Sequence, residues 1–254
     1  MAKKPSKPAE LSTPAAMTAA QFVARLKELQ SDAELKKIQR YFKSEAGEYG
    51  AGDQFMGVKM GQVFALAKEF IALPPAEIDK LLASPIHEVR AGGCSVMDKQ
   101  ARSAKTPESR RKELYELYFA RMPQINNWDL VDLAAPFVVG GYLYERPRAF
   151  LYRLARSPNL WERRTAIVAT YYFIRQGDVD DTFALAEALL HDDEDLIHKA
   201  VGGGLRWAGD SDPQRLLAFL DKHAAVMPRV MLRYAVEHLS AAQRAKYMKA
   251  KDKG

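Results

Sequence analysis

The chain has 254 residues, of which 48% are hydrophobic and 28% are charged, a composition that is ordinary for a soluble globular protein. Its formal net charge is +6, which favours a polyanionic partner. The single cysteine, Cys94, excludes an internal disulfide and favours a reducing, cytoplasmic environment. Its helical, glycine-rich surroundings predict a core position. No apolar run approaches the length of a membrane span, so no membrane partner is expected.

The chain begins with a stretch that is basic but lacks the apolar core of a secretory signal, since Lys3, Lys4 and Lys7 lie among Pro, Ala and Ser. Residues 1–17 are therefore predicted to be a disordered basic tail. A solubilising role is favoured for this tail over a contribution to polyanion binding. Residues 18–250 are predicted to form a single domain.

The predicted domain has the periodicity of helices, because its hydrophobic residues recur every three or four positions and no alternating strand pattern is present. Thr18 with Gln21, and Ser31 with Glu34, have the spacing of a capping box. Proline at first-turn positions, as at Pro75, marks other helix starts. Helices are predicted to begin near residues 19, 32, 75, 86, 107, 127, 147, 159, 180, 194, 213 and 228.

Several of these starts repeat along the chain. Five similar stretches begin at residues 84, 122, 157, 192 and 227, so that the first two are 38 positions apart and the others 35. This period is typical of solenoids built from two-helix repeats. The sequence thus predicts an all-α fold, a right-handed α-solenoid of HEAT-like repeats with a concave basic groove.

The second repeat is exceptional because its helix carries Trp128 and Asp132 at positions where the other repeats have Arg or Lys. These two side chains share one face of the helix. Residues 101–176 hold thirteen Lys and Arg against seven Asp and Glu. An indole and a carboxylate inside a positive field suit the binding of a polyanion and chemistry on an electron-poor centre. Trp128 and Asp132 are therefore the predicted catalytic residues. The nearby Asp129 is expected to cap or pair locally.

Basic residues at equivalent positions of the repeats are predicted to line the concave wall and to bind phosphates. The alternative for each one is an ion pair with an acid of the neighbouring repeat, which would stabilise the stack. Residues 177–197 carry eight acids and no Lys or Arg, and they are predicted to form a solvated outer face. The basic set comprises Arg90, Arg163, Arg164, Lys199, Arg206, Arg229 and Arg233.

The chain also contains six short motifs in a fixed order. These are R-Y-[MF]-K at 40–43, F-x-G-[VI] at 55–58, W-D-x-V-D at 128–132, W-x-x-R-x-A at 161–166, K-A-[VI]-G followed by L-R at 199–206, and L-R-Y-A at 232–235. With these motifs, roughly residues 20–248 resemble the HEAT-like-repeat alkylpurine DNA glycosylases of the AlkD type. The repeats predict the fold, and the resemblance indicates a family that has this fold.

The resemblance implies a monofunctional glycosylase that hydrolyses the N-glycosidic bond of cationic N3- and N7-alkylated purines in duplex DNA, with the lesion still stacked. In that reading Asp132 stabilises the sugar cation and aligns water, while Trp128 offers its π face to the same charge. Arg164 would hold the phosphate near the lesion, and Tyr41 would contact the backbone. The other predicted DNA-binding residues are Lys43, Arg163, Lys199, Arg206 and Arg233.

One position departs from the family pattern. The family has a second cleft tryptophan directly after the Gly of K-A-[VI]-G, where this chain has Gly203, and Trp207 lies one helical turn further on. The three glycines at 202–204 cost a helix roughly 2–3 kcal/mol relative to alanine, so a close backbone approach is expected there. The departure favours one alternative, a non-catalytic relative that binds bent or branched DNA. A further alternative is a solenoid that binds protein, because such repeats often hold helices or peptides.

Other chemistry finds little support in the sequence. The five histidines are scattered without metal-ligand spacing, so no metal and no cofactor are expected, and most of the histidines are predicted to be surface residues. Tyrosines at helical spacing, such as Tyr171, are predicted to pack between repeats. Because a solenoid that wraps a duplex can act alone, the protein is expected to be a monomer.

Overall fold

The computed structural model of the protein describes residues 17–43 and 50–250, so the predicted tail, apart from Met17, lies outside the described residues. Over this part of the chain the structure is helical, apart from one isolated bridge between Gln54 and Ile86. The helices are α1 (Ala19–Lys27), α2 (Asp32–Tyr41), α3 (Met60–Glu69), α4 (Pro75–Leu82), α5 (His87–Arg102), α6 (Glu108–Ala120), η1 (Met122–Gln124), α7 (Trp128–Ala134), η2 (Ala135–Gly140), α8 (Gly141–Leu143), α9 (Ala149–Leu154), α10 (Leu160–Arg175), α11 (Asp180–Ala188), α12 (Asp195–Ser211), α13 (Pro213–His223), α14 (Arg229–Ala235) and α15 (Ala241–Met248).

Each predicted helix start lies within two residues of an observed one. Two longer helices, α3 and α15, were missed. The start of α3 lacks a side-chain cap, because Lys59 at its N-cap makes no such hydrogen bond. Helix α15 begins with a capping box formed by Ser240 and Gln243, the same local signal that marks α1, and could have been predicted from it.

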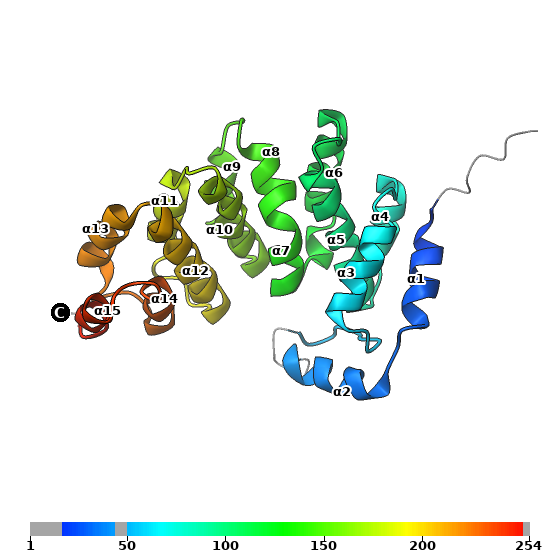
Figure 1. The fold of residues 1–254 in the computed structure, drawn as a ribbon, viewed down its shortest axis with the longest axis horizontal. Helices are drawn as coiled ribbons and strands as arrows, with labels where there is room; N and C mark the ends of the chain where they lie inside the picture. The colour runs from blue at the N-terminus through cyan, green and yellow to red at the C-terminus, as the bar shows by residue number, and fades with distance from the viewer. Residues whose placement is uncertain (1–16, 44–49, 251–254) are drawn as a thin grey trace, which may run out of the picture.

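The helices form two layers that follow the chain from end to end (Figure 1). One layer contains α3, α5, α7, α10, α12 and α14, each packed against the next, and α4, α6, α9, α11 and α13 cover its other side. The row is arched, with α2 at one end and α14 and α15 at the other on the same side of it (Figure 1). The predicted all-α solenoid of paired helices is confirmed.

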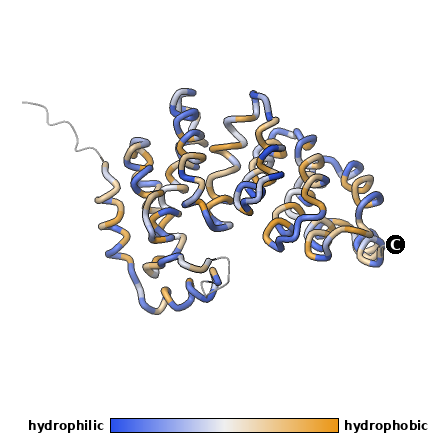
Figure 2. Tube along the Cα trace, turned by 180° about the vertical axis from the view of Figure 1, so that it is seen from behind, coloured by the Kyte–Doolittle hydropathy of each residue, from blue (hydrophilic) through white to orange (hydrophobic). Residues whose placement is uncertain are grey.

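The core runs between the layers as one continuous cluster of buried hydrophobic residues from Ala19 to Tyr247. Most helices show an apolar side and a polar side, as expected when each pair covers its neighbours (Figure 2). Cys94 is fully buried in this core, as predicted, and burial raises the pKa of its thiol.

Helices α7, η2 and α8 run without interruption, and the middle segment is a π-helix. Pro136 causes this irregularity because it lacks the N–H that would bond to the carbonyl of Asp132. The Gly141 N–H instead reaches back five residues to the Pro136 carbonyl. The π segment therefore begins just after the turn of helix that carries Trp128 and Asp132.

Helix α2 is attached to the stack at its two ends, since none of its own residues is buried. At its start, the Ser31 N–H donates to the Gly57 carbonyl at 3.1 Å, and a Cβ on Gly57 would lie 2.4 Å from the Ser31 carbonyl oxygen. Gly57 also has a φ of +80°, so the position requires glycine for two reasons. At its end, Phe42 is buried and places the adjoining Tyr41 against α7.

Candidate active site

A cleft of about 640 Å³ opens between α2, α7, α10, α12 and α14. It brings together seven of the residues predicted from the sequence: Tyr41, Lys43, Trp128, Asp132, Arg164, Lys199 and Arg206. The other residues that line it are Tyr171, Glu194, Asp195, Leu196, Ala200, Gly203, Trp207 and Tyr234. Residues almost 200 positions apart thus share one site because the repeats stack into an arch.

Asp132 and Arg164 form a two-pronged ion pair at this site. The guanidinium Nε lies 3.0 Å from Oδ1 and Nη2 lies 2.8 Å from Oδ2, while Nη1 donates to the Leu196 carbonyl. The Arg164 side chain is 7% exposed and the Asp132 side chain 36%. All the nitrogen atoms of Arg164 are engaged within the protein, so in this structure it orients a carboxylate. The resemblance had implied a phosphate contact for it.

The pKa of Asp132 is raised above its ordinary value because protein atoms surround the carboxyl group and withdraw it from water, although Arg164 opposes the change. Asp129 adds a smaller like-charge effect in the same direction. For Arg164, burial disfavours the charge, but the Asp132 carboxylate outweighs it and raises the pKa of the guanidinium. The arginine therefore favours the ionised carboxylate, whereas burial favours its neutral form.

Trp128 forms a second part of the cleft and is fixed by aromatic neighbours. The Phe42 ring stacks on the indole at a centroid distance of 5.8 Å, and the Tyr41 ring meets it edge to face at 5.9 Å. Asn127, the N-cap of α7, accepts a hydrogen bond from the Trp128 N–H. The indole is thus held in place while it borders the cleft, and Tyr41 is 64% exposed beside it.

The opposite part of the cleft is also aromatic. Tyr171 donates a hydrogen bond to the Ala200 carbonyl at 2.7 Å, and its ring meets Trp207 edge to face at 4.7 Å. Burial and the nearby Asp132 raise the pKa of the Tyr171 phenol, so it remains a hydrogen-bond donor. Trp207 is 41% exposed and borders the cleft, one helical turn after Gly203.

The charges around the cleft are mixed. Lys199 pairs with Asp195 at 2.6 Å, Arg206 pairs with Glu237, and Lys43 is exposed. Glu194 and Asp195 also line the cleft, so the prediction that the whole acidic stretch 177–197 lies on an outer face was wrong at its end. The reason is that α12, a helix of the cleft-lining layer, begins inside that stretch.

Other predicted cations lie away from the cleft lining. Arg163 binds Asp192 at 2.6 Å and the Ser157 and Pro158 carbonyls, and Arg90 is a buried partner of Asp53. These two arginines follow the alternative of an ion pair that stabilises the stack. Arg229 donates to the Met248 carbonyl, and Arg233 is exposed on α14.

Behind Trp128 lies a buried charge cluster that the sequence did not predict. His87 is fully buried, with Nδ1 3.3 Å from Asp53 and Nε2 2.8 Å from Asp129. Burial disfavours the charged imidazole, but the two carboxylates outweigh it and raise its pKa to about 9. Arg90 binds the other oxygen of Asp53, and Asn127 donates to Asp53. His87 is therefore an exception to the prediction that most of the histidines are surface residues.

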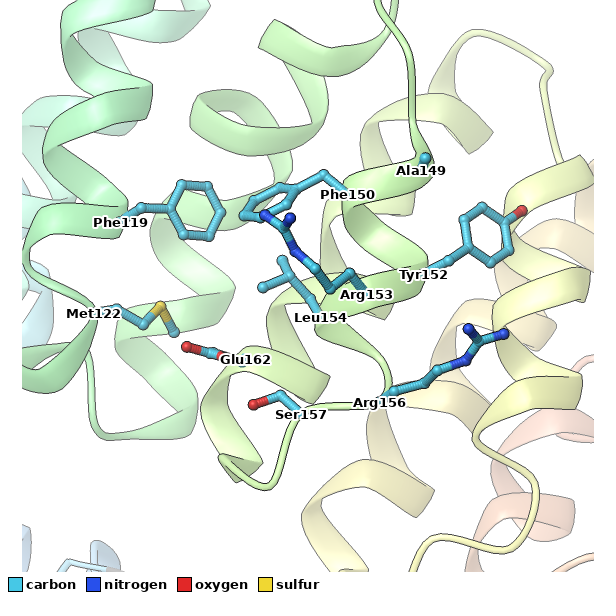
Figure 3. Close-up of a pocket in the computed structure, with 10 residues that line it drawn as sticks. All are labelled: Phe119, Met122, Ala149, Phe150, Tyr152, Arg153, Leu154, Arg156, Ser157 and Glu162. Atoms are coloured by element: carbon cyan, nitrogen blue, oxygen red, sulfur yellow. The ribbon is translucent and has the colours of Figure 1, made fainter.

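A second hollow, of about 820 Å³, lies between α6, α9 and the start of α10 (Figure 3). Phe119, Phe150, Met122 and Leu154 border it together with Arg153 (Figure 3). None of the predicted catalytic or DNA-binding residues lines it.

The model of a family described as "DNA alkylation repair enzyme" matches residues 22–239, which is most of the chain. The chain belongs to this DNA alkylation repair family. A solved structure described as a predicted DNA alkylation repair enzyme from Enterococcus faecalis is similar in fold, with a TM-score of 0.62 and 17% sequence identity over 84% of this chain and 97% of that one. The curated proteins include no match to this chain.

Among the described residues, this family member has neither a metal-binding cluster nor a membrane-spanning helix. No group of three or more His, Cys, Asp or Glu side chains there is arranged to hold a metal ion. No helix of the described part is long and apolar enough to cross a membrane.

Some residues of the site were missed or misjudged at the sequence level. Tyr171 was predicted to pack between repeats, yet it also borders the cleft, and Tyr234 was named only as part of a motif. A signal for Tyr171 was available, because it lies seven residues, two helical turns, after Arg164 and thus on the same face of α10. No local signal marks Tyr234.

Proposed function

We propose that this DNA alkylation repair protein is a monofunctional, monomeric DNA glycosylase, which hydrolyses the N-glycosidic bond of cationic N3- and N7-alkylated purines in duplex DNA. The observation that carries the proposal is the Asp132–Arg164 pair, which presents a partly exposed carboxylate beside the indole of Trp128 in one cleft. A fixed negative charge and a π face next to each other suit a transition state with a positively charged sugar.

Hydrolysis of this bond needs little help from a general acid. Alkylation leaves a positive charge on the purine, so the electrons of the C1′–N bond can leave with the base, which becomes neutral. The deoxyribose that remains has oxocarbenium character, and water adds to C1′ and releases a proton. The Asp132 carboxylate stabilises the cation and accepts a hydrogen bond from the water, while Arg164 favours its charged form.

Arg164 thus acts as a positioning residue. Its bidentate contact uses one lone pair on each Asp132 oxygen and leaves the others free to face the cleft. Because Arg164 also binds the Leu196 carbonyl, the carboxylate is held to α10 and α12 together. Trp128 is held from behind by Phe42, so both groups keep their places as the DNA binds.

Phosphate contacts are proposed for cations in the cleft and for one cation beyond it. Lys43 lies at the end of α2, and Arg233 is exposed on α14, at the opposite end of the arch. A duplex that crosses the arch could meet both, while Lys199 and Arg206 would exchange their carboxylate partners for phosphates. Such contacts predict that affinity falls steeply with added salt.

The test is release of the base from a duplex that carries a single N7-methylguanine, with an unmodified duplex for comparison. The wild type is expected to release 7-methylguanine, and Asp132→Asn is expected to slow release by roughly a hundredfold or more while it still binds the duplex. Asp195→Asn is the matched control, because it removes the same charge from an exposed place at the same cleft. It should leave release almost unchanged.

Equal background release by the wild type and Asp132→Asn would overturn the enzyme proposal. Tight binding to bent or branched DNA under those conditions would support the alternative, a non-catalytic DNA-binding protein. A flat salt dependence of binding would contradict the proposed phosphate contacts and leave a protein-binding solenoid.

A further inference from the structure

The second hollow, between α6, α9 and the start of α10, is separate from the cleft, because no residue that lines one also lines the other. Helices α6 and α9 belong to the layer on the far side of the stack from α2 (Figure 1). The volume of the hollow, about 820 Å³, is in the range of sites that bind a ligand or the side chains of a partner. A partner could therefore bind here while the cleft holds DNA.

One part of the second hollow is apolar (Figure 3). The half-buried rings of Phe119 and Phe150 meet edge to face at a centroid distance of 4.8 Å. Met122 and Leu154, each 4% exposed, line the hollow beside them. Two phenyl rings next to buried hydrophobic side chains can remove an apolar side chain of a partner from water.

Two arginines line the same hollow. Arg153 and Arg156 are both exposed, and the guanidinium carbon of Arg153 lies 4.5 Å from the centroid of the Phe150 ring. Neither arginine forms an ion pair within the part of the chain that the structure describes, whereas Arg148 and Arg163 nearby are both paired with aspartates. Arg153 and Arg156 can therefore bind carboxylates of a partner without breaking an internal pair.

The carboxylate of Glu162 decides between two kinds of anionic partner. Glu162 lines the second hollow, is half-buried and forms no ion pair with a described residue. Its charge would repel the phosphates of a nucleic acid, whereas it can accept hydrogen bonds from the N–H groups of a peptide. A phosphate backbone also has no apolar group to place against the phenylalanines. The beginning of this chain is a poor occupant too, because Lys3, Lys4 and Lys7 give it the same sign of charge as the arginines.

We propose that the second hollow binds an acidic segment of a partner protein. A large apolar side chain of the segment packs against Phe119 and Phe150, and its carboxylates bind Arg153 and Arg156. Aromatic residues and arginine are the types that contribute most to the energy of protein interfaces, and here they lie together. The inference does not depend on the proposed glycosylase activity, since the cleft takes no part in it.

The test measures binding of a fluorescein-labelled peptide with blocked termini, Gly-Asp-Glu-Asp-Phe-Asp-Glu-Asp-Gly, to the full chain by fluorescence anisotropy. One matched peptide has Ala in place of Phe, and another has Asn and Gln in place of the acids. The wild type is expected to bind the first peptide, and each matched peptide should bind roughly tenfold or more weakly. Equal binding of the Phe and Ala peptides, or no binding of the first peptide, would overturn the inference.

The variant that tests the arginines combines Arg153→Gln with Arg156→Gln and should weaken peptide binding roughly tenfold or more. Arg175→Gln is the matched control, because Arg175 is also exposed and lies over a phenylalanine ring, 5.6 Å from the centroid of Phe137, but does not line the hollow. It should leave peptide binding unchanged. Circular dichroism checks that both variants fold, which is expected because the substituted side chains are exposed.

Anisotropy with a labelled DNA duplex separates the two kinds of anionic partner. The double variant of Arg153 and Arg156 should bind the duplex as the wild type does, because neither residue lines the cleft. An equal loss of affinity for the duplex and the peptide would show that the second hollow binds nucleic acid, and unchanged peptide binding would show that the arginines do not hold the segment. Either result would overturn the inference, and neither would refute the proposed glycosylase function.

Discussion

Asp129 and Asp132 are one helical turn apart on α7, yet they lie in opposite kinds of surroundings. The Asp129 side chain is 11% exposed and receives the buried His87 imidazole at 2.8 Å. The Asp132 side chain is 36% exposed, faces the cleft and receives the guanidinium of Arg164. Each carboxylate has a cationic partner from a different neighbouring repeat, α5 for the first and α10 for the second.

The difference lies in how completely the charges of each site are compensated. Around Asp129, the carboxylates of Asp53 and Asp129 meet the cations His87 and Arg90, and Asn127 ties the cluster to the start of α7. Around Asp132, burial raises the pKa of the carboxyl and Arg164 opposes this change only in part, so the negative charge is less completely compensated. A balanced buried cluster suits the positioning of Trp128, whereas a carboxylate with a perturbed pKa at the edge of a cleft suits chemistry.

The largest expected effect is the difference in protein stability that is lost when each of these two carboxylates is removed. Asp129→Ala leaves a fully buried imidazole without a main partner, and we expect it to lower the free energy of unfolding by about 3–5 kcal/mol. Asp132→Ala should cost about 1 kcal/mol, because water from the cleft can take the place of the removed carboxylate beside Arg164. Urea denaturation measures both. Equal losses would show that the two sites are energetically alike.

The pH dependence of stability tests the buried cluster by itself, because it depends on the charge of His87. The folded pKa of His87 is raised from 6.5 to about 9, so its contribution to stability is complete below pH 6.5 and is lost as the pH rises through 9. We expect the free energy of unfolding to fall by about 2–3 kcal/mol between pH 6.5 and 9. Urea denaturation at a series of pH values measures this slope.

His87→Gln should flatten that slope, and His238→Gln is the matched control, since His238 is half exposed in its pair with Asp210. An NMR titration of the His87 ring in the wild type gives an independent reading that does not depend on how well the variant folds. A ring that titrates near 6.5 would contradict the assignment of charge to the cluster.

The sequence predicted most of the fold because its signals are local. Capping residues and proline mark helix starts within a few positions, and the repeat period follows from comparing such starts along the chain. The common face of Trp128 and Asp132 is also local, since residues four apart on a helix project together. These features do not depend on how the repeats stack.

The partners across repeats could not be predicted in the same way. Asp132 meets Arg164 from 32 positions away, and His87 meets Asp129 from 42 positions away, so both contacts depend on the rotation between stacked helices. Arg163 and Arg164 show the limit most clearly. Consecutive residues on a helix point about 100° apart, so only one of the two can face the cleft. Choosing between them requires the orientation of α10 in the stack.

Gly202 and Gly203 of α12 show the same contrast between adjacent residues, since Gly202 is packed against α14 and Gly203 lines the cleft. Gly202→Ala forces α12 away from α14 and should lower the free energy of unfolding by about 1–3 kcal/mol. Gly203→Ala should raise it by about 0.5–1 kcal/mol, because a helical Cβ is gained without a clash. Thermal or urea denaturation of the two variants decides the matter, and a loss of stability at 203 would show that packing does require that glycine.

The smallest expected effect concerns the cations and separates those that pair within the stack from those that are open to DNA. Arg233 is exposed, so Arg233→Gln should reduce the slope of log affinity against log salt by about one. Arg163 is committed to Asp192 and two carbonyls, so Arg163→Gln should leave the slope unchanged and cost stability instead. Fluorescence anisotropy with a labelled duplex at several salt concentrations measures both slopes. If Arg163→Gln changed the slope as much as Arg233→Gln, the buried ion pair would have to open when DNA binds, and the division between structural and DNA-binding arginines would fail.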